Sequence, residues 1–211
     1  MTTIADAGPG CRGRPDGLRE RKKARTRAAL RQHALRLFRE QGYQQTTVEQ
    51  IAAAAEVSPS TFFRYFPTKE DLVLQDDVDT TIAAAFERQP AGLGPVAAFR
   101  AALREVTGSY SQADLDVIRE TTALIVTVPE VRARATDEFA RMIVVLSESL
   151  ARRTGRPADD LAVRAVAGGI IGVILSITLP LRSRPGDEDA ITAMFERTDR
   201  ALALLEAGLP L

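Results

Sequence analysis

The chain has 211 residues, 45% of them apolar, so it can bury one large core or two smaller ones. Its 28 basic and 28 acidic residues cancel, but residues 1–69 hold 13 Lys and Arg against 6 Asp and Glu, and the remainder holds 15 against 22. This asymmetry excludes an evenly mixed surface and indicates a polyanion-binding segment on an acidic scaffold, unless the basic residues only solvate a helix face.

Residues 1–19 are rich in Gly, Pro, Arg and Asp, which predicts a disordered basic arm. The only cysteine, Cys11, excludes an internal disulfide and favours a reducing cytoplasm. The first residues lack the charged start and apolar run of a signal peptide.

Three short helices are expected in residues 20–67. The first carries Leu30, Ala34 and Phe38 on one stripe and stops at Gly42. The second begins at a cap formed by Thr46 or Thr47 with Glu49. The third is capped by Ser58, has Pro59 at its first position and ends at Phe66, because Pro67 follows.

Residues 68–211 predict further helices and no strand. Thr68 and Asp71 begin a fourth helix, which is expected to run through Phe86. Helical stripes punctuated by Gly and Pro follow to the end of the sequence. We therefore expect an all-α fold of about nine helices, with an N-terminal domain at 20–67 and a larger one at 68–211.

One later segment is apolar all round. Residues 165–181 carry no charge, but this run of 17 residues is at the short limit for crossing a bilayer and contains three glycines and a proline. A helix buried on both sides explains it as well, and we expect no membrane association.

The tight turn AEVS (residues 55–58) between the second and third short helices is typical of a helix-turn-helix, whose recognition helix enters the major groove of DNA. Phe62 and Phe66, four residues apart, can anchor that helix on the core, and Arg64 can read guanine. The candidate DNA-binding residues here are Thr47, Ser58, Ser60, Thr61, Phe63, Arg64, Tyr65 and Lys69.

The stretch TTVEQIAAAAEVSPSTFFRYFPTKEDL resembles the DNA-binding domain of TetR-family regulators. The resemblance is specific over roughly residues 25–74. It implies a homodimer that represses transcription from a palindromic operator and releases DNA when a small molecule binds the C-terminal domain. Two residues depart from the family pattern: Glu56 stands where glycine is usual, so it must tolerate a positive φ, and Phe63 replaces a DNA-contacting tyrosine. Phe63 can still touch a thymine methyl group.

The arm carries a short basic string, Arg12-Gly13-Arg14-Pro15. Arginines of this kind can enter a narrow, A·T-rich minor groove. Nonspecific attraction to DNA is the alternative role for Arg12 and Arg14.

Two sets of residues are expected to act in the C-terminal domain. The inward stripes predict a small, largely apolar effector bound at Phe99, Leu103, Arg119, Thr122, Phe139 and Met142, although the same stripes suit a solid core. The family resemblance implies that the last two helices form a four-helix bundle with a partner, with candidate contacts at Ile171, Ile174, Leu175, Phe195 and Leu202.

Catalysis finds little support in the sequence. The single histidine, His33, rules out a His cluster for metal, and we expect no cofactor, metal or enzymatic activity. A constitutive or architectural dimeric DNA-binding protein remains the alternative function, and an all-α enzyme with a vestigial DNA-binding domain is a more distant one. The sequence leaves the effector, the operator and the choice between repressor and activator open.

Overall fold

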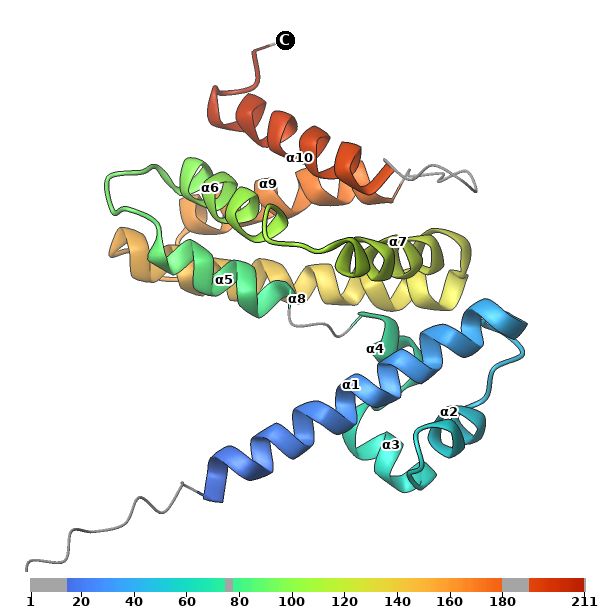
Figure 1. Ribbon diagram of the computed structural model, residues 1–211. Helices are drawn as coiled ribbons and strands as arrows, with labels where there is room; N and C mark the ends of the chain where they lie inside the picture. The colour runs from blue at the N-terminus through green and yellow to red at the C-terminus, as the bar shows by residue number, and fades with distance from the viewer. Residues whose placement is uncertain (1–14, 75–77, 180–189, 211) are drawn as a thin grey trace, which may run out of the picture. The chain divides into compact units, whose positions relative to one another are not determined.

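The computed structural model describes residues 15–74, 78–179 and 190–210, which form ten α-helices (Figure 1). In chain order they are α1 (Pro15–Gln41), α2 (Val48–Ala54), α3 (Pro59–Tyr65), α4 (Lys69–Leu74), α5 (Val78–Arg88), α6 (Pro95–Thr107), α7 (Gln112–Thr127), α8 (Pro129–Thr154), α9 (Leu161–Thr178) and α10 (Ala190–Glu206). The chain divides into two compact units between Pro67 and Thr68. The predicted all-α class is confirmed.

The first unit is a three-helix domain in which α2 packs against both α1 and α3. Its core is built from one stripe of each helix and includes Leu30, Ala34, Phe38, Ile51, Phe62 and Phe66. Tyr43, just after α1, packs at a tilt against Phe38, with 5.0 Å between ring centroids, and closes the end of this core.

Two details of the first unit differ from expectation. Helix α1 begins at Pro15 rather than Glu20, because proline suits a first helical position where the missing N–H has no partner. The cap of α2 is Thr47, whose hydroxyl accepts from the Gln50 N–H (3.2 Å) while Gln50 Oε1 accepts from the Thr47 N–H (2.9 Å). Thr46 is instead buried and donates to the Gly42 carbonyl (2.8 Å).

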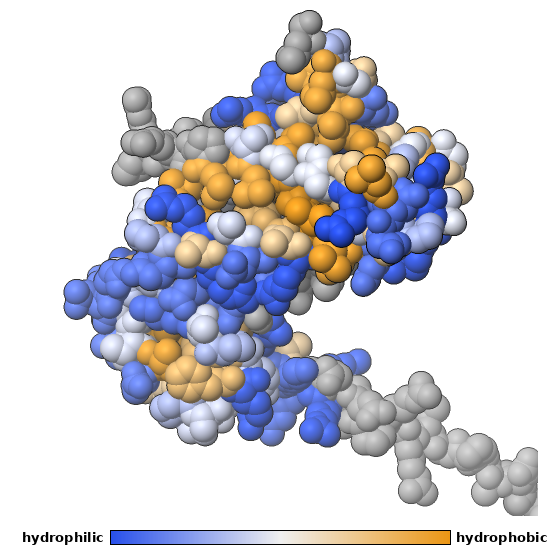
Figure 2. Space-filling view, turned by 180° about the vertical axis from the view of Figure 1, so that it is seen from behind, coloured by the Kyte–Doolittle hydropathy of each residue, from blue (hydrophilic) through white to orange (hydrophobic). Residues whose placement is uncertain are grey.

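The second unit surrounds a single apolar cluster. Helix α9 packs against α8 and α10, and α6 packs against α5 and α10. The buried cluster consists of Ala85, Phe86, Ala98, Phe99, Ala102, Leu103, Val106, Leu146, Leu150, Val163, Ala167, Ile170, Ile171 and Leu202. Apolar side chains also gather on the face of this unit seen in Figure 2, whereas the first unit is mainly hydrophilic in the same view.

The helix expected from Thr68 through Phe86 is two helices, α4 and α5, which accounts for ten described helices rather than about nine. The start of α4 is as predicted: the Thr68 N–H donates to Asp71 Oδ2 (3.1 Å), and the Asp71 N–H donates to Thr68 Oγ1 (3.2 Å).

Helix α9 is long and apolar enough to cross a membrane by length and composition alone. In the structure, Val163, Ala167, Ile170 and Ile171 on one side of it lie in the core of the second unit. Core packing therefore explains that side of α9, and its other side remains exposed or half-buried.

Candidate nucleic-acid interface

The turn between α2 and α3 is a Schellman motif. The Val57 N–H donates to the Ala52 carbonyl (2.9 Å), and the Glu56 N–H donates to the Ala53 carbonyl (3.1 Å). This pattern requires a left-handed residue after the helix, and Glu56 has φ = 55°, as predicted. Because glutamate lacks the freedom of glycine, the conformation costs about 1 kcal/mol. The turn redirects the chain so that α3 packs against α2.

Helix α3 is fixed at both ends by its own sequence. The Ser58 hydroxyl accepts from the Thr61 N–H (3.2 Å), and Pro59 occupies the first turn. Phe62 and Phe66 are fully buried and pack together with 5.9 Å between ring centroids. These two anchors determine which side of the helix faces away from the core.

The outward side of α3 carries Phe63 and Arg64. Phe63 is 52% exposed, an unusual position for a large apolar side chain, and rests edge-on against Phe62 at 5.4 Å. Arg64 is exposed, with its guanidinium 5.3 Å from the centre of the half-buried Tyr65 ring. A stacked guanidinium keeps its fork of donors available for a planar acceptor such as a guanine edge.

Hydroxyl groups surround the beginnings of α2 and α3. Ser58 Oγ lies 2.9 Å from Ser60 Oγ and 3.0 Å from Thr61 Oγ1, and Thr47 and Ser60 are both exposed. As caps, Thr47 and Ser58 accept from backbone amides, so each hydroxyl proton can still be donated. Groups of this kind bind DNA phosphates without reading sequence.

The remaining predicted DNA contacts lie outside this unit or outside the described residues. Lys69 begins α4 in the second unit, where partial burial lowers the pKa of its ammonium and the neighbouring Glu70 and Glu130 act in the opposite direction. Arg12 and Arg14 fall outside the described residues.

In the comparisons with known proteins, two different family models match the N-terminal and C-terminal parts of the chain. Residues 30–75 match the family model of bacterial regulatory proteins of the tetR family, and residues 93–210 match the MftR C-terminal domain. Over 161 residues, 72% of this chain and 71% of its relative, the sequence is 38% identical to the HTH-type transcriptional regulator TcmR of Streptomyces glaucescens. The chain belongs to the TetR family.

Solved structures agree with this assignment. Thermus thermophilus FadR, a TetR-family transcriptional repressor in complex with lauroyl-CoA, is 26% identical with a TM-score of 0.53, covering 88% of this chain and 95% of FadR. Salmonella enterica GusR shares the fold at 21% identity and a TM-score of 0.51, covering 88% and 95% of the two chains. This TetR-family chain is therefore a DNA-binding transcriptional regulator, and the family is not enzymatic. A bacterial transcription regulator of this kind acts in the cytoplasm.

The residues predicted to hold an effector are largely in the core of the TetR-family second unit. Phe99, Leu103 and Thr122 are buried, and Phe139 and Met142 are half-buried against the same cluster. The Arg119 side chain, 28% exposed, pairs with Asp116 at 2.8 Å. A depression of about 170 Å³ lies elsewhere, lined by Pro95, Leu150, Thr154, Arg156, Ala162, Val163 and Val166. The sequence did not predict it, because its walls come from three different helices.

The residues predicted to meet a partner subunit divide into two groups. Ile171 and Leu202 are fully buried within their own chain and offer no surface to a partner. Ile174, Leu175 and Phe195 are half-buried and remain candidates. Sequence periodicity placed all five on apolar stripes but could not separate the side of α9 that meets α10 from the side that does not.

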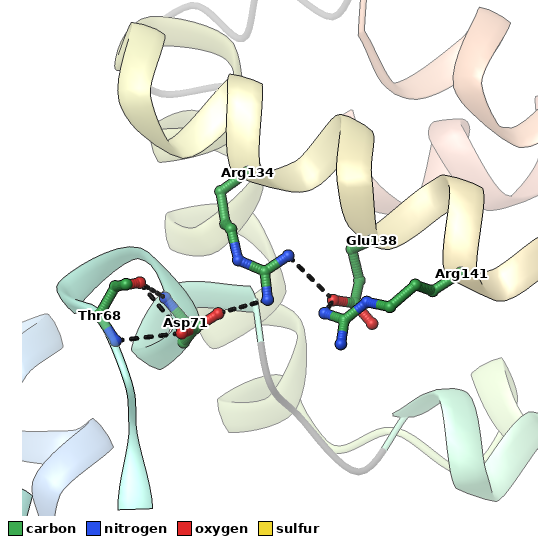
Figure 3. A network of polar contacts seen from close by, with 5 residues as sticks. All are labelled: Thr68, Asp71, Arg134, Glu138 and Arg141. Atoms are coloured by element: carbon green, nitrogen blue, oxygen red, sulfur yellow. Dashed lines mark hydrogen bonds and ion pairs between the residues drawn. The ribbon is translucent and has the colours of Figure 1, made fainter. Parts of the chain in front are cut away.

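A charge network that starts at the buried Asp71 joins α4 to α8 (Figure 3). Asp71, 2% exposed, pairs with Arg134 at 2.6 Å and also accepts from both the N–H and the hydroxyl of Thr68. Arg134 reaches Glu138 at 3.4 Å, and Glu138 in turn pairs with Arg141. The capping residues were recognisable from their spacing, but the partner of Asp71 lies 63 residues further along the sequence and carried no local signal.

Proposed function

We propose that this regulator is a repressor that binds a palindromic operator as a homodimer and leaves it when a small, largely apolar molecule occupies the second unit. The observation that carries the proposal is the geometry of α3, which two buried phenylalanines orient so that Phe63 and Arg64 face outward. Similarity to FadR, described as a repressor in complex with lauroyl-CoA, supports the ligand-responsive part.

In the DNA complex, Arg64 donates two hydrogen bonds to a guanine and Phe63 contacts a thymine methyl. Thr47, Ser58, Ser60, Thr61 and Tyr65 hold the phosphates on either side, and Lys69 adds a phosphate contact from the start of α4. Arg12 and Arg14 reach the adjacent minor groove. Selection of bound sequences from random duplex DNA by the purified protein tests this arrangement, which requires an enriched palindrome with half-sites one helical turn apart, about 34–36 Å.

The dimer is proposed to form across the outer side of α9 together with α10. Gly169 packs closely on α10, since a Cβ there would lie 3.3 Å from Leu205, but a Cβ at Gly168 or Gly172 would meet nothing within 4 Å. Each helical glycine costs about 1 kcal/mol relative to alanine, so the latter two need a contact from outside the chain. Close approach of a partner helix beside Ile174 and Leu175 supplies it.

Sedimentation of a bulky variant tests this dimer. Gly172→Arg has room in the single chain and should leave the thermal unfolding of the subunit nearly unchanged, yet it should produce a monomer with weak operator binding. Ala84→Arg, at an exposed position of α5, is the matched control and should stay dimeric. A dimeric Gly172→Arg protein with normal operator affinity excludes this face.

The effector is proposed to be an apolar chain with an anionic end. Phe139 and Met142 are only half-buried, and Phe99, Leu103 and Thr122 lie behind them in the same unit. Arg119, paired on the surface with Asp116, is the cation that can exchange its partner for an anionic head group. A ligand that prefers the DNA-free state a hundredfold, about 2.7 kcal/mol, would be an effective switch.

The route from effector to DNA is proposed to pass through α4. This helix directly follows the boundary between the units, and the Asp71–Arg134 pair holds it on α8, which also carries Phe139 and Met142. A shift of α8 would therefore change the position of the chain segment that leads into the DNA-binding unit.

Thermal-shift screening with fatty acids and their coenzyme A thioesters, followed by operator affinity with and without each stabilising compound, tests the switch. The proposal requires a compound that both raises Tm and weakens operator binding, with Arg119→Gln losing selectivity for the anionic form. Stabilisation without any change in DNA affinity supports the second candidate, a constitutive dimeric DNA-binding protein. The burial of Phe99 and Leu103 in a packed cluster favours that candidate.

A further inference from the structure

The first half of α1 extends away from the core of the DNA-binding unit. The inward stripe of α1 runs from Phe38 through Ala34 to Leu30, the first buried residue among the helix positions whose side chains the structure describes. One turn earlier, Arg27 lies over the Phe66 ring at 5.2 Å and marks the end of this packing. In Figure 1 the helix continues well past α2 and α3.

The extension is a basic, exposed helix. Residues 19–27 contain six Lys and Arg and a single acid, Glu20. Five of the cations are exposed: Arg19, Arg21, Lys22, Lys23 and Arg25. On the inward stripe, the positions before Arg27 are Lys23 and Arg19, which are both exposed, so beyond the contact of Arg27 with Phe66 these two positions offer no apolar side chain to the core.

The spacing of the charges also opposes a helix in the free protein. Residues four apart lie on the same face, and like charges there destabilise a helix. Three such pairs fall in this segment: Arg19 with Lys23, Arg21 with Arg25, and Lys23 with Arg27. Glu20 with Lys23, three residues apart, is the one opposite-charge pair at helical spacing within residues 19–27. A helix that is polar on all sides and has so few opposite-charge pairs is marginal alone, so a partner that neutralises its charge would stabilise it.

We infer that residues 19–27 of α1 form a second DNA-contacting element, which lies along the phosphates of the duplex flanking the operator half-site and whose helix is stabilised by that contact. This inference rests on the DNA binding described above and concerns a surface apart from α3. The positive charge of this segment is complementary to a polyanion. DNA is the polyanion that the same unit already binds, so it is the partner expected here.

The dimensions fit such a contact. Nine helical residues span about 14 Å, which corresponds to about four base pairs of duplex. Since the exposed cations lie on several sides of the helix, they can meet phosphates without any particular base sequence. The element should therefore add affinity and salt dependence but leave sequence preference unchanged.

One substitution separates helix formation from DNA contact. In Arg21→Glu, the new acid stands four residues before Arg25, the favourable orientation for an opposite-charge pair. The free variant should be more helical than wild type and bind DNA less well. The control Arg152→Gln/Arg156→Gln removes the same total charge, two units, from exposed side chains of the second unit.

The measurements use the full chain and a selected operator duplex, either trimmed at the half-sites or extended by one helical turn on each side. In hydrogen exchange, wild-type amides of residues 19–27 should gain protection on the extended duplex only. Without DNA, the same amides should be about two- to fivefold more protected in Arg21→Glu than in wild type. On the extended duplex, Arg21→Glu should bind about tenfold more weakly, with the salt slope lower by about one to two. The control should lose little.

Several outcomes would overturn the inference. Equal losses in Arg21→Glu and the control would show general electrostatic attraction only, and absence of DNA-induced protection would show a helix that needs no partner. Equal protection of residues 19–27 by anionic lipid vesicles and by extended duplex would exclude a dedicated DNA contact. If Arg64→Ala alone loses operator preference while Arg21→Glu matches the control, the extension has no role and the regulator function stands.

Discussion

The two units of this regulator are all helical, but they differ in how their sequences specify structure. In the first unit, short-range interactions define each element: Thr47 with Gln50 caps α2, Ser58 caps α3, and Phe62 and Phe66 orient α3 on the core. In the second unit, helices are held by contacts between distant residues, such as the Arg100 fork on Asp199 with N–O distances of 3.1 Å. The DNA-binding surface of the first unit can therefore be predicted from short stretches of sequence, whereas the roles of residues in the second unit depend on contacts that the sequence does not show.

Substitution of a phenylalanine that anchors α3 on the core should give the largest effect, because it should destabilise the first unit and leave the second unit folded. Phe62→Ala removes a fully buried ring and should destabilise the first unit by about 3 to 5 kcal/mol, enough to unfold a domain of this size. The second unit, with its own core, should remain folded. Two unfolding transitions in calorimetry, of which only the first moves, would show this.

The adjacent Phe63 provides the matched control. Because Phe63 is 52% exposed, Phe63→Ala should leave both transitions nearly unchanged while weakening operator binding. Equal destabilisation by the two alanine substitutions would contradict the orientation assigned to α3.

The counterpart in the second unit is the buried pair of Asp71 and Arg134. Arg134→Ala leaves a 2% exposed carboxylate without its cation, which should destabilise this unit by about 3 kcal/mol. The double variant Asp71→Asn/Arg134→Met should recover much of that loss, because no charge is then left unpaired. Urea unfolding of wild type, Arg134→Met, Asp71→Asn and the double variant measures the coupling, and additive losses would show that the pair is not coupled.

Recognition of DNA is expected to depend on side chains that contribute little to folding. Arg64→Ala should relax preference at one base position by about 1 to 3 kcal/mol, whereas Lys69→Ala should weaken all DNA similarly and reduce the salt slope by about one. Thermal unfolding should not change in Arg64→Ala. Binding to a panel of single-base operator variants distinguishes the two effects, and an unchanged base preference in Arg64→Ala would contradict base reading by this residue.

Much of the fold was predictable from the sequence because helix ends carry short-range signals. Helix α3 begins at Ser58 and Pro59 and ends before Pro67, and α4 begins with the cap formed by Thr68 and Asp71. The division of the expected fourth helix into α4 and α5 was missed, since the apolar stripe continues from Leu74 to Phe86 in the sequence.

The candidate sites were predictable to different extents. The outward side of α3 follows from the spacing of Phe62 and Phe66, a property of one helix. The fate of Phe99, Ile171 and Leu202 depends on which other helices cover them, so periodicity marked them as apolar without separating core, pocket and interface. The cluster of cations in residues 19–27 was visible in the sequence. That this segment is not packed on the core became clear only from the structure, where the buried stripe of α1 stops at Leu30.

A reciprocal pair of substitutions gives the smallest expected effect. Both units end a helix with a left-handed residue: Gly155 with φ = 69° after α8, and Glu56 with φ = 55° after α2. Glu56→Gly should stabilise the first unit by about 1 kcal/mol, because glycine adopts this conformation without steric cost. Gly155→Glu should destabilise the second unit by a similar amount, and since a Cβ there meets nothing within 4 Å, the backbone conformation alone should account for it. Chemical denaturation of both variants tests whether the two units, so different in packing, obey the same local rule. A loss much larger than about 1 kcal/mol in Gly155→Glu would show that tertiary contacts decide even the helix ends of the second unit.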